Sequence, residues 1–533
     1  MAARSTPSLT IEQQRKLERL SGDFTYFAKA FLRIRTKSGE VVPFVLNAAQ
    51  KRLHDKLEDQ VRRTGKVRAV VLKGRQMGSS TYIQGRFFWR MWKRDGRGLK
   101  AFILTHEQAA TDNLFKMTKR FQERAPEGLT HPTVAANAKE LAFDGRDSSY
   151  IVATAGTKGV GRSDTIQLFH GSEVAFWPNA EDHIDGVEQA IADSAGTEKI
   201  LESTANGIGN VFQRRYAAAE RGDSVEEAIF LPWYWDDGYR EPAPLGWSPS
   251  SKWLEYQSAA SIDFDQLYWA FQKNRGMATL TAQSVDEPCW KFKQEYPSSA
   301  AEAFQTAGNS FIPSPKIAQA RKARVISQGP LIIGIDPARG GDKTGAIDRR
   351  GRTMGQVVCE RWDFTDTMLI VGKVVRLIQM YRPEAVNIDV GGLGAPIYDR
   401  LAELGYGNIV NAINFGSSPL GVGPTGDELY ANRRAEMWDL LRDWFNDPAG
   451  VDIPDDDVLQ ADLTSVVWGN QATRYNSNNE LLLEAKDKIK ERLGFSPDLG
   501  DAAALTFAIP IAPAFYGDDD EPEYEGRNSA TGY

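Results

Sequence analysis

A loop with the residue types that bind phosphates follows the apolar residues 67–72 and precedes a helical pattern. Its residues are Lys73, Gly74, Arg75, Gln76, Met77, Gly78, Ser79, Ser80 and Thr81. Such a loop turns successive backbone N–H groups toward a polyphosphate, and the dipole of the following helix adds to the attraction. In the usual motif a lysine precedes the hydroxyl residue that binds Mg²⁺. Here Ser79 takes the lysine position and Ser80 the hydroxyl position, whereas Lys73 stands in place of the first glycine and could still reach the phosphates. A basic turn between a strand and a helix is the alternative interpretation.

Two further segments could complete an ATP-hydrolysing site. A predicted strand runs into Ser172 and Glu173, where ATPases keep a metal-binding Asp followed by a Glu that polarises water. Glu173 is therefore the candidate catalytic base, with an N-cap role as the alternative. Because Ser172 replaces the Asp, Mg²⁺ would depend on Ser80, water and Glu173. The next strand runs into a segment that could sense a γ-phosphate or form an ordinary turn: Ser203, Thr204, Ala205 and Asn206.

Four aspartates in the C-terminal half could bind metal ions. Asp336 and Asp389 each end an apolar strand, and Asp498 and Asp501 lie three residues apart on one face of a helical pattern. Carboxylates that converge from two strands and a helix can hold two divalent metals about 4 Å apart, as phosphodiester hydrolysis requires. Each acid alone would be an ordinary cap or turn residue. We favour Asp501 over Asp498 as the main ligand.

Several other charged residues accompany these aspartates. Asp342 could assist from outside the metal shell. A basic run, either a DNA-backbone contact or a solvated helix face, consists of Lys486, Lys488, Lys490 and Arg492.

The elements that must position these residues follow an α/β pattern. In the first half, short β-rich segments alternate with helical patterns, which predicts a largely parallel sheet covered on both faces: 67–72, 100–105, 149–154, 165–169, 199–203 and 228–233. A second α/β set begins near residue 330 and ends near residue 508. The sequence between them is rich in Trp, Tyr, Pro and Ser and predicts a smaller connecting subdomain.

The composition limits the class of protein. The 533 residues carry a net charge of −7, which excludes a uniformly basic DNA coat, although residues 51–100 hold a local basic excess. Two cysteines exclude a disulfide framework and a cysteine-rich zinc site and fit a reducing cytosol. No secretory signal or membrane-spanning stretch is apparent. The acidic tail is expected to be disordered.

The order and spacing of these motifs over residues 40–510 resemble the large terminase subunit of tailed bacteriophages. The stretch 292–312 resembles the segment that joins the two domains of that family. The resemblance implies an α/β chain with a P-loop (RecA/ASCE-like) ATPase domain and an RNase H/integrase-like nuclease domain. The corresponding boundaries are an N-terminal helical arm, the ATPase domain, a linker or lid subdomain, the nuclease domain and the acidic tail, at 1–40, 41–235, 236–325, 326–512 and 513–533.

The resemblance also implies roles for single residues. Several members place the loop lysine as Lys73 is placed, and Arg75 corresponds to the loop arginine. Gln50 resembles the glutamine that reads adenine, and Glu173 the catalytic glutamate. Residues 203–206 resemble the motif that couples hydrolysis to movement. Arg162 resembles the arginine that a neighbouring subunit inserts, with a surface loop arginine as the alternative. In the second domain, residues 497–502 resemble the segment that supplies the last nuclease acid.

The function implied is a viral DNA-packaging motor that hydrolyses ATP with Mg²⁺ and cuts DNA with two divalent metals, Mg²⁺ or Mn²⁺. The implied partners are double-stranded DNA, the portal protein, the small terminase subunit and further copies in a ring, with a monomer possible in solution and no membrane. The implied location is the host cytoplasm. The main alternative, motivated by Ser79 and Ser172, is a metal-dependent nuclease or recombinase whose first domain binds without hydrolysing. A helicase is disfavoured because no second RecA-like repeat is apparent.

Overall fold

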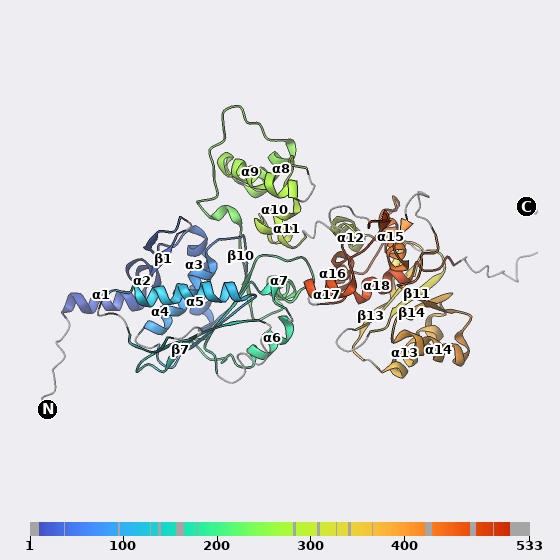
Figure 1. Ribbon diagram of the computed structural model, residues 1–533, viewed down its shortest axis with the longest axis horizontal. Coiled ribbons are helices and arrows are strands. Elements are labelled where there is room, and N and C mark those ends of the chain that lie inside the picture. Colours follow the sequence, from blue (N-terminus) through green and yellow to red (C-terminus); the bar gives the residue numbers. More distant parts are fainter. Residues whose placement is uncertain are drawn as a thin grey trace, which may run out of the picture. The chain divides into compact units, whose positions relative to one another are not determined.

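The chain forms two compact units, which a computed structural model describes over most of its length (Figure 1). The described residues are 10–511 apart from 37, 94–95, 128, 130, 137–139, 156–164, 179, 281–283, 306–309, 327, 339–342, 365, 422–428, 469–475 and 494. Within them, the first unit comprises the residues up to Ser314 with 464–467 and 484–496. The second unit comprises the remaining residues.

An eight-stranded sheet forms the centre of the first unit, in the order β10-β3-β9-β8-β4-β7-β6-β5. Six neighbouring strands from β10 to β7 run parallel, and β6 and β5 add an antiparallel edge. The strands are β3 (Val67–Lys73), β4 (Lys100–Thr105), β5 (Thr133–Ala136), β6 (Glu140–Phe143), β7 (Ser148–Thr154), β8 (Leu168–Ser172), β9 (Glu198–Ser203) and β10 (Glu227–Leu231). The six predicted strands are confirmed, with β8 beginning three residues later than expected. Strand β9 lies between β3 and β8, so the strand before the loop and the strand before Glu173 are not neighbours.

Helices cover both faces of this sheet, as its buried strands require. Val67–Lys73 is buried along its whole length, and the aromatic residues Phe24, Phe27 and Phe31 belong to the same core. A small β1–β2 pair (Arg33–Arg35, Val41–Pro43) follows these aromatic residues. The helices of this part are α1 (Ile11–Gly22), α2 (Phe24–Phe31), α3 (Ala48–Thr64), α4 (Ser79–Trp92), α5 (Gln108–Glu123), α6 (Ala180–Glu188) and α7 (Val211–Arg221), with short 3₁₀ turns η1 (Val174–Phe176) and η2 (Trp233–Trp235). Helix α17 (Lys486–Leu493) is also assigned to the first unit.

The helical part of the first unit is held together by aromatic side chains. This part corresponds to the predicted connecting segment. Trp233 and Tyr239 both stack on Trp269, with ring centroids 5.0 and 4.5 Å apart. The helices here are α8 (Ser251–Ala260), α9 (Phe264–Leu280), α10 (Trp290–Glu295) and α11 (Ala300–Gln305). The abundance of Trp and Tyr in this segment is therefore explained by a local core.

A five-stranded sheet forms the second unit, in the order β13-β12-β11-β14-β15. Strands β11, β14 and β15 run parallel, whereas β12 and β13 form an antiparallel meander with β11. This is the arrangement of a ribonuclease-H-like sheet, as predicted. The strands are β11 (Leu331–Asp336), β12 (Thr344–Arg350), β13 (Thr353–Trp362), β14 (Ala385–Asp389) and β15 (Val410–Ile413), with a short β16–β17 pair (Leu429–Tyr430, Glu480–Leu481).

The helices of the second unit surround this sheet. They are α12 (Ser314–Lys322), α13 (Thr367–Tyr381), α14 (Gly394–Leu401), a π-helical turn η3 (Ala402–Tyr406), α15 (Arg433–Phe445), α16 (Asp457–Ser465) and α18 (Asp498–Leu505). Two glycines let α18 approach the sheet. A Cβ atom at Gly334 would lie 2.0 Å from the Ala502 oxygen, and one at Gly345 would lie 2.2 Å from the Asp498 oxygen.

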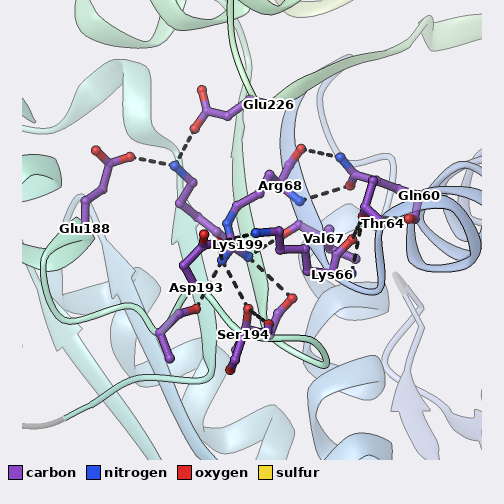
Figure 2. Close-up of polar contacts among 12 residues, drawn as sticks. Gln60, Thr64, Lys66, Val67, Arg68, Glu188, Asp193, Ser194, Lys199 and Glu226 are labelled. Atoms are coloured by element: carbon purple, nitrogen blue, oxygen red, sulfur yellow. Dashed lines mark hydrogen bonds and ion pairs between the residues drawn. The ribbon is translucent and has the colours of Figure 1, made fainter.

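Much of the basic excess in residues 51–100 is paired inside the first unit. Figure 2 shows Lys66 and Arg68, near the start of β3, directed at Asp193, and Lys199 of β9 held between Glu188 and Glu226. These contacts lie at the end of the sheet where β3 and β9 begin, and the phosphate loop lies at the other end. They therefore anchor the two strands without contributing to the site.

None of the described helices is long and apolar enough to cross a membrane.

Candidate ATPase and nuclease sites

The predicted phosphate loop connects β3 to α4 through two residues with left-handed backbone. Gln76 has φ +55° and Gly78 has φ +76°, a region in which glycine is favoured. The amide of Gln50 donates to the Gly78 oxygen at 2.8 Å, and Asn47 donates to the Met77 oxygen at 3.3 Å. A Cβ atom at Gly78 would lie 2.5 Å from the Gln50 amide nitrogen. Gln50, predicted to read adenine, thus holds the backbone of the loop in this structure.

Lys73 ends β3 and lies between two carboxylates. Its ammonium is 2.7 Å from Glu173 Oε1 and 3.3 Å from Glu202 Oε2. Burial disfavours the charge of Lys73, but the two carboxylates outweigh it and raise its pKa above the usual value. The lysine is therefore charged at neutral pH and points to the carboxyl ends of β8 and β9, next to the candidate base and the segment 203–206.

Glu173 is held by the segment predicted to couple hydrolysis to movement. Its backbone is left-handed, with φ +54°, and its side chain is 25% exposed. The Ser203 hydroxyl and the Thr204 N–H both donate to Glu173 Oε2, at 3.3 and 3.2 Å. The backbone N–H of Ala175 donates to Ser203 Oγ, and the Asn206 amide donates to the Ala175 oxygen. Any displacement of Glu173 must therefore change the hydrogen bonds of this segment.

Glu202, a fully buried glutamate on β9, was not among the predicted site residues. Its Oε1 accepts hydrogen bonds from Ser80 at 2.6 Å and from Ser172 at 2.9 Å, and lies 3.3 Å from His170 Nε2. Burial opposes its charge, but the Lys73 ammonium and the bonds from His170 and Ser80 prevail and hold the pKa of Glu202 well below its usual range. The signal in the sequence was an acid directly after the apolar pair Ile200 and Leu201 of a predicted buried strand, because a buried acid requires a partner.

Arg75 is directed at the helical part of the first unit. Its backbone N–H donates to the Glu295 oxygen at 2.7 Å, and its guanidinium is 3.1 Å from the Glu295 carboxylate, which raises the pKa of Arg75. Gln294, the neighbouring residue of α10, donates to the Ala205 oxygen at 2.8 Å. One short helix thus contacts both the phosphate loop and the coupling segment. Arg162 lies outside the described residues.

The donor set suits a nucleotide with its magnesium ion. The first-turn amides of α4 and the Lys73 ammonium can bind phosphate oxygens. Ser80 supplies a hard oxygen atom of the kind that Mg²⁺ prefers, and the buried Glu202 carboxylate accepts the hydrogen bond of this hydroxyl. Gly74 belongs to the tight part of the loop, where a Cβ atom would lie 3.2 Å from Trp233. Thr81 lies in the first turn of α4.

In the second unit, two of the predicted metal ligands lie side by side. Ile335 pairs with Ile388 in the parallel β11–β14 ladder, so Asp336 and Asp389, the next residue of each strand, reach the same end of the sheet. Both side chains are buried, and Asp389 Oδ1 accepts a hydrogen bond from the Gly391 N–H at 3.0 Å. This edge is where open α/β sheets place their ligands.

The two aspartates of α18 are engaged by different partners. Asp498 Oδ2 accepts from the Lys343 N–H at 3.1 Å and lies 3.3 Å from Arg361. Asp501 Oδ1 accepts from Arg434 at 2.9 Å and from the Trp438 indole at 2.8 Å.

Among the described residues, no group of three or more histidine, cysteine or acidic side chains is placed to hold a metal ion. The side chains present therefore do not yet form the predicted two-metal site, and the choice between Asp498 and Asp501 stays a prediction. Asp342 lies outside the described residues.

A further carboxylate beside α18 was not predicted. Asp462 is fully buried, and its Oδ2 accepts from the Leu499 N–H at 2.7 Å. Burial, reinforced by Asp498 and opposed by Arg361, raises the pKa of Asp462 to about 8.

The predicted basic run begins in α17. There Lys488 pairs with Glu491 at 2.8 Å on an exposed face. Lys486 and Lys490 lie in the same helix, and nothing is described of the Arg492 side chain.

The fold and these sites define an α/β chain with a P-loop ATPase-like unit and a ribonuclease-H-like unit. Solved structures to which the chain is similar include large terminases of bacteriophages. The HK97 bacteriophage large terminase is 12% identical, with 92% of this chain and 99% of that chain covered and a TM-score of 0.48. A large terminase from a thermophilic bacteriophage is 10% identical, with 87% of this chain and 98% of that chain covered and a TM-score of 0.32.

The nuclease domain of the large terminase subunit gp2 of bacterial virus Sf6 is 21% identical, with 38% of this chain and 100% of that chain covered and a TM-score of 0.33. No protein-family profile matches the chain. No curated protein matches it either.

Proposed function

We propose that this protein is a DNA-packaging enzyme that hydrolyses ATP in its first unit and cuts DNA in its second. The observation that carries the proposal is the contact of Lys73 with Glu173 and Glu202 at the end of β3. A loop lysine, a solvent-accessible glutamate and a magnesium-binding hydroxyl, Ser80, then face one site. That combination is the one that phosphoryl transfer to water requires, and the stability of the sheet alone does not explain it.

The residues divide the work of hydrolysis as follows. Lys73 neutralises charge on the transferred phosphoryl group, and the loop amides bind its oxygens. Glu173 accepts a hydrogen bond from the attacking water and orients it in line with the leaving oxygen. Magnesium, when bound with the nucleotide, supplies further neutralisation of the phosphates. Ser203 and Thr204 hold Glu173, so the position of the base and the conformation of this segment are linked.

For the second unit we propose a metal-dependent endonuclease around Asp336 and Asp389, with Asp501 or Asp498 as the third ligand and two Mg²⁺ or Mn²⁺ ions. The adjacent β11 and β14 ends support the first two assignments. Among the described residues, the acidic side chains do not gather into a complete metal site, so the third ligand and both metals belong to the proposal alone.

The partners of such an enzyme belong to the same proposal. Double-stranded DNA is the substrate, and phosphate contacts suffice because packaging must accept any sequence. The portal protein, the small terminase subunit and further copies in a ring are proposed from the resemblance of the motifs. The same applies to Arg162 as the arginine supplied to a neighbour and to the host cytoplasm as the location.

Two substitutions test whether the activities are separate. Lys73→Ala should abolish ATP hydrolysis and spare Mn²⁺-dependent cleavage of plasmid DNA. Asp336→Ala should do the reverse. Loss of both activities in each folded variant would contradict the proposal.

The second candidate function is a nuclease whose first unit binds nucleotide without hydrolysing it. Ser79 motivates it, because its buried hydroxyl has no hydrogen-bond partner among the described residues at the position where most phosphate loops carry lysine. Nucleotide binding without turnover, in the presence of DNA and at high protein concentration, would favour this candidate.

A further inference from the structure

Strand β8 ends in Ser172 at the position where ATPases of this type carry an aspartate, and the carboxylate lies instead on the neighbouring strand. We propose that Glu202 of β9 is the positioning carboxylate for the magnesium ion of the bound nucleotide, acting through Ser80 from the strand beside Ser172. The inference rests on the proposed ATP-binding function and deepens it.

The register of the sheet places Glu202 where this role requires it. Glu202 pairs with Ser172 in the β8–β9 ladder and with Val71 in the β3–β9 ladder. It therefore lies between the strand that precedes the loop and the strand that precedes Glu173. The Ser172 hydroxyl donates to Glu202 Oε1 at 2.9 Å. The serine at the usual position of the aspartate therefore orients the Glu202 carboxylate, which takes over the role of that aspartate.

Hydrogen bonding to Glu202 prepares Ser80 for a cation. Because Ser80 donates its proton to Glu202 at 2.6 Å, the lone pairs of its oxygen remain available for a metal. His170 secures the same carboxylate. Its Nδ1 lies 2.6 Å from the Gln84 amide nitrogen, a donor, which leaves the hydrogen on Nε2 to donate to Glu202.

Because it is buried, Glu202 is not an ordinary surface acid. It is fully buried, and its Oε2 has no hydrogen-bond partner among the described residues, with only the Lys73 ammonium nearby at 3.3 Å. A buried carboxylate with spare acceptor capacity is costly unless a cation or a further donor completes it. The remaining alternative is that Glu202 serves only as a structural partner of Lys73.

Charge balance distinguishes these two roles. Lys73 faces two carboxylates, Glu173 and Glu202, so the site carries an excess negative charge that repels a nucleotide without metal. A magnesium-bound nucleotide removes that repulsion. Neutralising Glu202 should therefore weaken binding of the magnesium complex and leave the metal-free nucleotide bound equally or more tightly. A purely structural role would change both affinities by the same factor.

The test is equilibrium binding of a fluorescent ADP analogue to the full-length protein, with Mg²⁺ and with EDTA. The measured quantity is the ratio of the Kd without metal to the Kd with Mg²⁺. Glu202→Gln should lower this ratio by about tenfold or more, because one charge close to the cation is lost. Adding Ser172→Asp to that variant should return the ratio to within about threefold of the wild-type value, since the carboxylate is restored from the adjacent strand.

Glu198→Gln is the matched control. Glu198 is also fully buried on β9 and pairs with Arg86 at 2.7 Å and Arg90 at 2.5 Å, at the start of the strand. Its replacement should lower thermal stability and leave the ratio unchanged.

An unchanged ratio in folded Glu202→Gln would overturn the inference, as would a ratio that stays low after Ser172→Asp. Wild-type protein that binds no nucleotide under either condition would instead overturn the proposed function, and the inference with it.

Discussion

Replacing Lys73 by methionine should destabilise the strands around the phosphate loop by an amount that depends on pH. The substitution keeps the length of the side chain and removes its charge, which leaves Glu202 fully buried without its ion-pair partner. Removing one member of a buried pair costs about 3 kcal/mol or more. Glu173, which is 25% exposed, can recover part of its solvation and is not counted. We therefore expect a loss of about 3 kcal/mol at pH 8.

The direction of the pH dependence follows from the pKa of Glu202. In the wild-type protein this pKa is depressed, so its stabilising effect is present above the unfolded-state value and is lost as the pH falls through the folded-state value. In Lys73→Met, burial without the ammonium should raise the pKa above the unfolded-state value. The variant then regains about 1.4 kcal/mol for each pH unit below that raised pKa. The difference between the two proteins should shrink from pH 8 to pH 5.

Hydrogen exchange read by mass spectrometry suits this measurement, because a chain of two units has no single unfolding transition. The peptides to follow cover β3 and β9. Their opening free energy should fall in Lys73→Met at pH 8 and recover by more than about 1 kcal/mol at pH 5. The double variant Lys73→Met/Glu202→Gln should recover most of the loss at both pH values. A loss that is equal at the two pH values, or unaffected by Glu202→Gln, would show that the unpaired charge of Glu202 is not its cause.

Three further predictions concern other parts of the chain. Gly345→Ala should lower DNA cleavage at least tenfold and leave ATP hydrolysis within twofold of the wild-type rate. The reason is that the added Cβ would lie 2.2 Å from the Asp498 oxygen and force α18 off the sheet. Equal loss in both assays would contradict this prediction. Gln294→Ala should speed hydrogen exchange in the peptide that contains Ala205, because a buried carbonyl loses its donor at a cost of about 1–3 kcal/mol; unchanged exchange there would contradict the contact. Burial raises the pKa of Cys359 to about 12. Iodoacetamide at pH 8 should therefore alkylate this thiol at least about a hundredfold more slowly in the folded protein than in urea. Rapid labelling of the folded protein would contradict the burial of the thiol.

The fold could be predicted from the sequence wherever the signal is local. The parallel strands of both units are short apolar runs that are buried on both faces of the sheet. Each of the six runs predicted in the first unit contains or overlaps a strand. The antiparallel edge strands β5 and β6 were missed. In β6, half-buried and buried residues alternate, so the strand lacks the uniform burial that a continuous apolar run indicates. The position of the predicted phosphate loop between a strand and a helix is confirmed, because its glycines and its flanking elements are local features.

The parts of the site that depend on strand order could not be predicted. Glu202 is adjacent to Ser172 only because β9 lies beside β8, and no spacing in the chain encodes that neighbourhood. The same limit applies to Asp501. Helical periodicity places it near Asp498, but the donors that engage it, Arg434 and Trp438, come from α15, more than 60 residues away in the sequence.

If the first unit hydrolyses ATP with Glu173 as its base, Glu173→Gln should remove turnover with little change in the size of the side chain. Steady-state ATP hydrolysis should be measured with DNA at high protein concentration, together with nucleotide binding. The variant should bind the magnesium–nucleotide complex within about threefold of the wild-type affinity and lose turnover by about 100-fold or more. Turnover that persists in Glu173→Gln would show that Glu173 is not the base.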